Sequence, residues 1–305
     1  MPKRKSDFSL WVEGARLRTL PLAVAPIIVA TGVSVTLQGQ IDWLKTLLAL
    51  AVALFLQIGV NYANDYSDGV RGTDSNRVGP LRLTGSGTFT PKTVKLVAFG
   101  FLALGGLSGL ALILLTQLWW LLSIGAIAIL AAWFYTGGKR PYGYAGLGEV
   151  VVFIFFGLVA VFGTVYVSHP ELFNSRELIL MVAPSAIGIG LYASAVLMIN
   201  NIRDIETDRP VGKKTLAVRV GKGWAKAIYL FMIWSPLALG WFYPTVSVAF
   251  LAAFVYPLAI VLILLPVTLI VLTAKTPREN ILALKLTSYS ALAYAVLLAL
   301  GLQVR

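Results

Sequence analysis

Long apolar segments, separated by short polar ones, make up most of this chain and limit the folds that it can adopt. At about 17 to 25 apolar residues per membrane crossing, we count nine candidate spans. They cover residues 20–38, 44–64, 93–115, 117–136, 147–168, 178–200, 224–242, 246–272 and 281–303. Only 12% of the 305 residues are charged, and 58% are hydrophobic. The sequence therefore predicts an all-α polytopic membrane protein and excludes an ordinary soluble domain.

The basic residues are distributed unevenly over the segments between these spans. With the N-terminus in the cytoplasm, 22 of the 25 lysines and arginines fall on the cytoplasmic side, and Lys45, Arg176 and Arg305 fall on the other. Cytoplasmic loops carry an excess of basic residues, so this split predicts an N-terminus inside and a C-terminus outside. It also explains the net charge of +12 without a nucleic-acid partner. We expect the lipid bilayer as the surroundings of the chain and infer no obligate protein partner.

The predicted organisation is one transmembrane domain over residues 1–305. A cytoplasmic N-terminal segment covers residues 1–19, and two cytoplasmic loops cover residues 65–92 and 201–223. Each loop begins with acidic residues, and the two clusters together contain Asp65, Asp68, Asp74, Asp204, Glu206 and Asp208. They follow the second and the sixth span, four spans apart. This spacing predicts a duplicated four-helix unit with one added helix.

Polar residues at the ends of the second and sixth spans lie on one helical face. The stripe on the second span consists of Gln57, Asn61, Asn64, Asp65 and Asp68, and the sixth carries Ser194, Asn201, Asp204 and Asp208. Carboxylates three or four residues apart on a helix are neighbours that repel each other. The negative end of the helix dipole adds to this cost. Both clusters therefore indicate a bound cation.

The chemistry of these side chains indicates which cation. Carboxylate and amide oxygens are ligands for a hard ion, and the chain has no cysteine and a single histidine, His169. Mg²⁺ is typically held by one or two carboxylates together with substrate phosphates. Basic residues near the clusters, which include Arg71, Arg77, Arg82, Arg203, Lys213 and Lys214, could bind phosphate oxygens directly. We infer a diphosphate bridged by Mg²⁺.

Three alternatives stay open at this point. The acidic and basic residues could be solvated caps of the helices with no ligand. Glu149, at the start of the fifth span, could equally be a helix-start residue or a ligand. A secondary transporter would also have polar residues within its helices, but it would place them near mid-membrane.

Several motifs resemble those of a known family. Residues 64–68 (NDYSD) and 201–208 (NIRDIETD) resemble the two Asp-rich signatures of the UbiA superfamily of intramembrane prenyltransferases. Residues 16–21 (RLRTLP), 135–144 (YTGGKRPYGY, continuing to Gly148 and Glu149) and 208–216 (DRPVGKKTL) are similar to its 1,4-dihydroxy-2-naphthoate polyprenyltransferase branch. Where many members carry a third Asp in the first signature, this chain has Gly72, which leaves the role of Asp74 open.

The resemblance implies nine helices around a central cavity open to lipid, with both Asp motifs at its cytoplasmic mouth and two Mg²⁺ ions bridging the diphosphate. It implies catalytic roles for Asp65, Asp68, Asp204, Asp208 and Tyr135. The expected metal ligands are Asn64 and the same four aspartates. The expected substrate-binding residues are Asn61, Asn64, Arg71, Arg77, Arg82, Lys139, Arg140, Asn201, Arg203 and Lys213.

The implied reaction is Mg²⁺-dependent transfer of a polyprenyl group from polyprenyl diphosphate to 1,4-dihydroxy-2-naphthoate. Diphosphate and CO₂ are lost, and demethylmenaquinone is formed for menaquinone biosynthesis in the bacterial cell membrane. Transfer of a phytyl group, or transfer to 4-hydroxybenzoate, are the alternatives within the superfamily. The sequence leaves open the tail length, the oligomeric state and the residues that recognise the acceptor.

Overall fold

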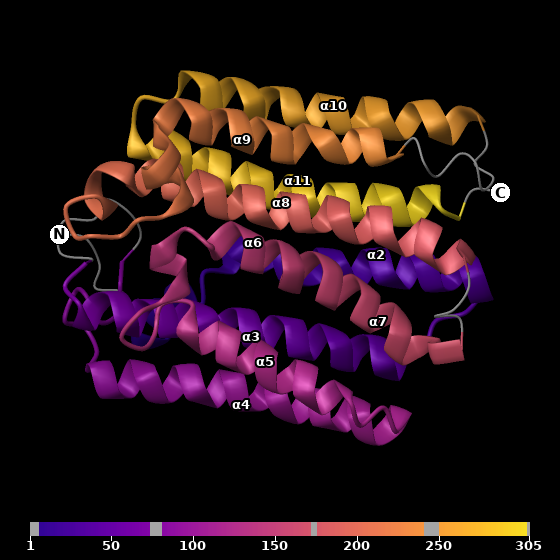
Figure 1. The fold of residues 1–305 in the computed structure, drawn as a ribbon, viewed down its shortest axis with the longest axis horizontal. Coiled ribbons are helices and arrows are strands. Elements are labelled where there is room, and N and C mark those ends of the chain that lie inside the picture. Colours follow the sequence, from indigo (N-terminus) through magenta and orange to yellow (C-terminus); the bar gives the residue numbers. More distant parts are fainter. Residues whose placement is uncertain (1–5, 74–80, 172–175, 241–249, 304–305) are drawn as a thin grey trace.

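The computed structural model describes residues 6–73, 81–171, 176–240 and 250–303. The secondary structure in this part of the chain consists of helices, without β-strands (Figure 1). Six helical segments are long and apolar enough to cross a membrane. They are α2 (Pro21–Gln38), α3 (Trp43–Val70), α4 (Pro91–Thr116), the segment Gly148–Ser168, the greater part of α8 (Arg176–Asp208), and α11 (Pro277–Gly301).

The remaining helices are α1 (Asp7–Gly14), α5 (Leu121–Phe134), α9 (Leu216–Gly240) and α10 (Phe250–Thr273). All nine predicted spans overlap helices of the structure. The membrane prediction is confirmed in its coarser form, an all-helical chain with six candidate spans. Crossing of the membrane by α5, α9 and α10 stays a prediction.

Local sequence explains where several helices begin and end. The Asp42 side chain caps α3 by accepting a hydrogen bond from the Lys45 backbone N–H at 3.1 Å. Thr276 and Glu279 form a reciprocal capping box at the start of α11. Gly221 (φ 81°, ψ 163°) interrupts α9, so the apolar part of that helix begins after a kink.

Two helices continue beyond their predicted spans. We expected the second span to end at residue 64 and the sixth at residue 200, with the polar stripes on the helix ends and loops over residues 65–92 and 201–223. The structure has helix through both stripes: α3 continues to Val70 and α8 to Asp208, so four of the aspartates lie on helix ends and both loops begin later than expected. At 1.5 Å per residue these helices are about 42 and 50 Å long, whereas the hydrocarbon core is about 30 Å thick. Their last turns therefore extend past the apolar layer.

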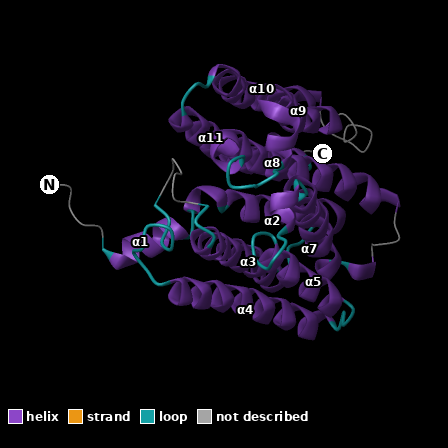
Figure 2. Cartoon of the chain, turned by 60° about the vertical axis from the view of Figure 1, so that its left-hand side comes forward, coloured by secondary structure: helices purple, strands orange, loops and turns teal. Residues whose placement is uncertain are grey.

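Small residues allow the helices to pack closely. Gly59 of α3 and Gly105 of α4 contact Leu102 and Leu56 of the facing helix, and Gly32 of α2 faces Ala299 of α11. Figure 2 shows α9, α10 and α11 grouped on one side and α3, α4 and α5 on the other. The helices α2, α7 (Ala160–Ser168) and α8 lie between the two groups. Close approach at glycine and alanine is typical of helix packing in membranes, where lipid is as apolar as the side chains.

Many large apolar side chains on the outside of the bundle are exposed. Examples are Leu107 of α4, Leu130 of α5 and Leu269 of α10, which are 62%, 54% and 60% exposed. Apolar surface on this scale is typical of a protein solvated by lipid. The outer faces thus agree with the membrane assignment.

The segment Gly148–Ser168 contains α6 (Gly148–Val152), the π-helix η3 (Phe153–Val159) and α7. A Cβ atom on Gly157 would lie 2.5 Å from the Ala186 carbonyl oxygen and 2.7 Å from the Gly190 Cα, so η3 touches the backbone of α8. The wider π turn presents Phe155, Phe156 and Val159 to the interior, where they line a cavity. Such π turns often occur at functional sites.

The two ends of the described chain lie at opposite ends of the bundle. The α1 helix lies at the end where α3 and α8 terminate, and α11 finishes at the far end (Figures 1 and 2).

Candidate active site at the mouth of an apolar cavity

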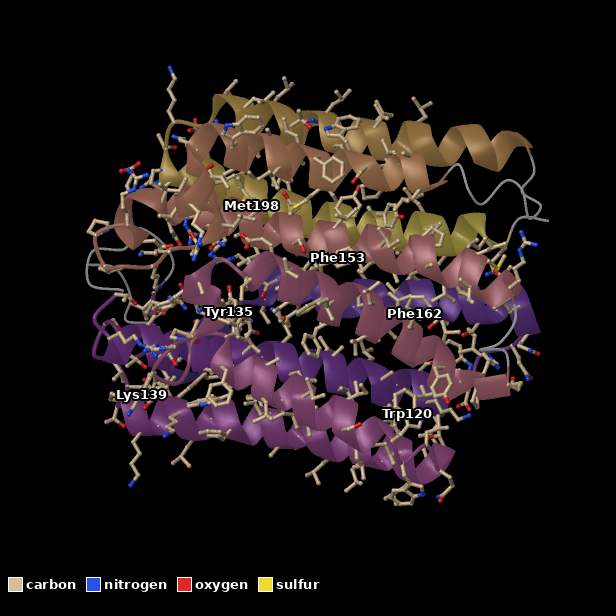
Figure 3. The ribbon with its side chains drawn as sticks, in the orientation of Figure 1. Trp120, Tyr135, Lys139, Phe153, Phe162 and Met198 are labelled. Carbon is tan, nitrogen blue, oxygen red and sulfur yellow. The ribbon has the colours of Figure 1, made fainter. Side chains whose placement is uncertain are left out.

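A cavity of about 610 Å³ runs between α2, α3, α4, α5, the segment Gly148–Ser168 and α8. Its inner wall is apolar and includes Val52, Ile113 and Phe155. Its polar lining is concentrated toward one end and includes Asn64, Asp68, Asn201, Asp204, Asp208 and Lys213. In Figure 3, nitrogen and oxygen atoms gather at the end where Lys139 lies, with Tyr135 on its inner side. The volume and the apolar lining are those of a small-molecule site.

Lys213 connects the two acidic clusters. Its Nζ lies 3.2 Å from Asp68 Oδ1 and 3.8 Å from Asp208 Oδ1, so a single ammonium group stands between carboxylates of α3 and α8. Arg82 approaches Asp68 from the other side, with Nη2 3.8 Å from Oδ2. Asp68, Asp208 and Lys213 are all buried. The fold thus brings together residues that are 145 positions apart.

Tyr144, in the 3-10 turn Tyr142–Ala145, is a site residue that sequence analysis did not single out. Its hydroxyl donates a 2.5 Å hydrogen bond to Asp68 Oδ1, and Lys213 Nζ lies 4.7 Å from the centre of its ring. Burial, and next the negative charge of Asp68, raise the pKa of Tyr144 above its ordinary value. The hydroxyl therefore stays protonated and remains a donor at neutral pH.

Asp204 lines the cavity, and its two oxygens are held by the neighbouring Arg203. Arg203 Nε and Nη2 each lie 2.6 Å from an oxygen of Asp204, and Nη2 also donates to Asn200 Oδ1. These two parallel hydrogen bonds fix the orientation of the Asp204 carboxylate. Arg203 does not itself line the cavity.

Asp65 has a different environment from the other three aspartates. Its side chain is 1% exposed, and its two oxygens accept the backbone N–H groups of Leu83 and Thr84 at 2.9 and 2.8 Å. It does not line the main cavity. The structure thus places Asp65 where it holds the loop that follows α3.

A second set of predicted residues holds the loop after α5. Arg71 donates to the carbonyl oxygens of Thr136 and Gly138, and the Thr136 hydroxyl donates to Asn64 Oδ1 at 2.7 Å. Asn64 lines the cavity, whereas Lys139 and Arg140 lie in the same loop with their side chains exposed. The structure therefore brings Asn64 to the mouth and leaves Lys139 and Arg140 on the rim.

Of the other predicted residues, Asn61 and Asn201 line the cavity. Arg77 and Asp74 lie outside the described residues. Asn201 Nδ2 donates to Glu149 Oε1 at 2.8 Å. Glu149 is 2% exposed, and its second oxygen accepts no hydrogen bond from the residues that the structure describes. Glu149 is therefore more than a helix-start residue: it orients Asn201. Only a tertiary contact reveals this.

The mouth is suited to Mg²⁺ bound together with a diphosphate. In the described ranges, no group of three or more Asp, Glu, His or Cys side chains could hold a metal by itself. Asp68 and Asp208, with Asn64 and Asp204 beside them, supply the oxygen ligands that Mg²⁺ prefers. An ion here needs further oxygens, which diphosphate would provide. Asp68, Asp208, Asp204 and Asn64 are the side chains that would hold it.

Sequence comparison identifies several similar proteins. The chain is 51% identical over 224 residues to the 1,4-dihydroxy-2-naphthoate octaprenyltransferase of Mycobacterium tuberculosis, covering 73% of this chain and 74% of that protein. It is 44% identical over 218 residues to the protein of the same name from Escherichia coli, covering 70% and 68%.

Structure comparison identifies the same fold in two archaeal proteins. A UbiA homolog from Aeropyrum pernix aligns with a TM-score of 0.68 at 17% identity, over 92% of this chain and 96% of that one. A UbiA homolog from Archaeoglobus fulgidus bound to GPP and Mg²⁺ aligns with a TM-score of 0.61 at 15% identity, over 93% and 99%. The sequence profile of the UbiA prenyltransferase family matches residues 23–289. With this match over most of its length, the chain belongs to the UbiA prenyltransferase family.

Proposed function

We propose that this protein transfers a polyprenyl group from polyprenyl diphosphate to 1,4-dihydroxy-2-naphthoate. The observation that carries the proposal is a single cavity that joins a charged mouth at Asp68, Asp208 and Lys213 to an apolar interior. A prenyl diphosphate has the same two parts, a charged head and an apolar tail. Relatives that are 42–51% identical carry the name 1,4-dihydroxy-2-naphthoate octaprenyltransferase.

The diphosphate is held at the mouth by Lys213 and Arg82, which lie on opposite sides of Asp68. We propose two Mg²⁺ ions there, held by the aspartates of both helices and by Asn64; when bound, they neutralise charge on the leaving diphosphate. The archaeal UbiA homolog bound to GPP and Mg²⁺ has the same fold. Asp65 contributes by holding the loop that carries Arg82.

The reaction breaks the allylic C–O bond, and its electron pair leaves with the diphosphate. The ring carbon that bears the carboxylate attacks the allylic carbon, and a new C–C bond forms. Loss of CO₂ then restores the aromatic ring and gives the quinol form of demethylmenaquinone. Tyr135 and Phe156 line the cavity wall, where an aromatic face stabilises positive charge on the allylic group. The apolar wall excludes water from that carbon.

We also propose a membrane topology for the chain. The helix pairs α3–α4 and α8–α9 both pack closely, and in each pair the first helix ends in an acidic cluster. This similarity supports a duplicated four-helix unit with α11 added, and nine crossings in all. The excess of basic residues at the Asp end supports an orientation with the mouth and N-terminus in the cytoplasm and the C-terminus outside. The bacterial relatives support a location in the bacterial cell membrane.

The test is a panel of donors and acceptors with purified protein, Mg²⁺ and product identification by mass spectrometry. We expect diphosphate, CO₂ and a prenylated naphthoquinol from an all-trans polyprenyl diphosphate and dihydroxynaphthoate. Prenylation of 4-hydroxybenzoate instead, or a requirement for phytyl diphosphate, would contradict the proposal. A secondary transporter would form no product with any pair.

The location of the acidic residues also disfavours a transporter. Asp68, Asp204 and Asp208 lie at one end of the cavity, whereas a transporter would place its polar residues near mid-membrane.

A further inference from the structure

A second polar patch lines the cavity on the wall formed by η1 (Leu17–Thr19), the residue before it, and α3. It consists of Arg16, Thr19, Gln57 and Asn61, which we name the arginine patch. Asn61 precedes Asp68 by seven residues on α3 and so lies about 10 Å deeper in the bundle. The patch therefore faces the space beside the first carbons of a prenyl group whose diphosphate is bound at Asp68. The reaction requires the acceptor ring in that space.

Arg16 occupies an unfavourable backbone conformation. Its φ of 55° and ψ of 57° are left-handed, and it directly follows the cap of α1. Glycine or asparagine usually takes this place after a helix, because a Cβ atom lies too close to the following carbonyl oxygen; glycine has no Cβ, and asparagine offsets the cost with local hydrogen bonds. Strained residues of this kind are concentrated at ligand sites, where the surrounding structure maintains them. An arginine here indicates that its side chain is needed.

Hydrogen bonds hold the patch in place and leave ligand-binding groups available. Thr19 Oγ1 donates to the Arg16 carbonyl at 2.9 Å and accepts from Gln57 Nε2 and Asn61 Nδ2, each at 3.2 Å. The guanidinium has one hydrogen bond within the described residues, from Nη2 to the Asn61 carbonyl at 3.4 Å. The amide oxygens of Gln57 and Asn61 accept none from described residues. One cationic donor and two neutral acceptors thus border the cavity.

We propose that the arginine patch binds the acceptor, with Arg16 on its carboxylate and the amide oxygens of Gln57 and Asn61 on its hydroxyl groups. A guanidinium pairs with a carboxylate through two parallel hydrogen bonds, and amide oxygens accept from hydroxyls. The patch is complementary to a hydroxylated aromatic acid and lacks the paired carboxylates at which a metal-bound diphosphate sits. This inference rests on the proposed function and assigns the acceptor subsite within it.

The test measures binding of two unreactive probes, 1-hydroxy-2-naphthoate and 1-naphthol, by calorimetry on the full chain in detergent. The two probes differ only in the carboxylate. Arg16→Asn removes the guanidinium, and it should keep the fold because asparagine tolerates the left-handed conformation. The control is Arg278→Gln, which removes one exposed cationic side chain on α11 outside the cavity.

We expect the wild type and Arg278→Gln to bind the naphthoate about tenfold or more tightly than 1-naphthol, and Arg16→Asn to bind both equally. The Kd of farnesyl diphosphate with Mg²⁺ should be the same in all three proteins. Retention of the carboxylate preference in Arg16→Asn would overturn the inference, and so would the absence of any preference in the wild type. A third contrary result would be that Arg16→Asn weakens only the binding of farnesyl diphosphate with Mg²⁺ and not that of the naphthoate. If the wild type prenylates dihydroxynaphthoate, these outcomes leave the proposed function intact.

Discussion

At the scale of single residues, four aspartates with similar sequence surroundings have different environments. Asp68 and Asp208 face the same ammonium group of Lys213, whereas Asp65 accepts two backbone N–H groups and lies outside the main cavity. Asp204 is oriented by Arg203. The four carboxylates therefore differ in their partners, although their places in the two motifs are similar.

Asp208→Asn should abolish most activity and leave the fold intact. The amide has the shape of the carboxylate but lacks the negative charge that a cation at the mouth requires. We expect kcat/KM to fall about 100-fold or more, with little change in the temperature of unfolding. The matched control is Glu206→Gln on the same helix end, where the side chain is exposed; its activity should stay near that of the wild type. Near-normal turnover in Asp208→Asn at saturating Mg²⁺ would contradict the assignment.

Asp65→Asn should affect stability more than metal dependence. One of the two backbone N–H groups of Leu83 and Thr84 would face an amide NH₂ in place of an acceptor. Loss of a hydrogen bond to a charged group costs about 1.5–3 kcal/mol. Thermal unfolding should occur at a lower temperature, and the loop after residue 81 should be cleaved faster by protease. The remaining activity should keep the Mg²⁺ concentration dependence of the wild type; a shift in that dependence would identify Asp65 as a metal ligand.

At the scale of elements, the π-helix η3 determines the shape of the cavity wall. Gly157 allows η3 to approach α8 at Ala186 and Gly190, and the wide turn directs Phe155 and Phe156 to the cavity. Helix α8 in turn carries Asn201, Asp204 and Asp208. Packing between these two helices therefore links the apolar wall to the charged mouth.

Gly157→Ala should separate η3 from α8. The added methyl would lie 2.5 Å from the Ala186 carbonyl oxygen, so the backbones must move apart. Overpacking of this kind costs about 1–3 kcal/mol, and we expect a lower temperature of thermal unfolding in detergent. Gly100→Ala on α4 is the control, because a Cβ there meets no atom within 4 Å. Equal stability of the two variants would show that the contact between η3 and α8 is unimportant.

At the scale of the whole molecule, the mouth and the end of α11 lie at opposite ends of the bundle (Figure 1). The basic residues gather at the mouth, and the loop after α2 lies at the other end. A charged prenyl diphosphate would therefore enter from the side with the basic loops. Its apolar tail would lie in the apolar interior of the cavity, at the same depth as the lipid chains around the bundle.

Because the natural chain contains no cysteine, single cysteines can report this orientation. Ser86→Cys lies at the mouth and Gln40→Cys at the opposite end, both at exposed positions. In intact cells, a membrane-impermeant thiol reagent should label Gln40→Cys, and it should label Ser86→Cys only after the membrane is opened. The reverse pattern would invert the topology. Activity of both variants provides the control for folding.

From the amino-acid sequence alone one can predict the membrane class, the approximate helical ranges, the two acidic clusters and the family motifs. Each of these follows from local composition or from spacing along one helix. Which members of a stripe face the cavity depends on the packing of neighbouring helices and cannot be predicted from one helix: Asp65 accepts from Leu83 and Thr84, and Tyr144 donates to Asp68, 76 residues away. The same holds for Arg16, whose backbone strain and place on the cavity wall exist only once α1 and α3 are packed.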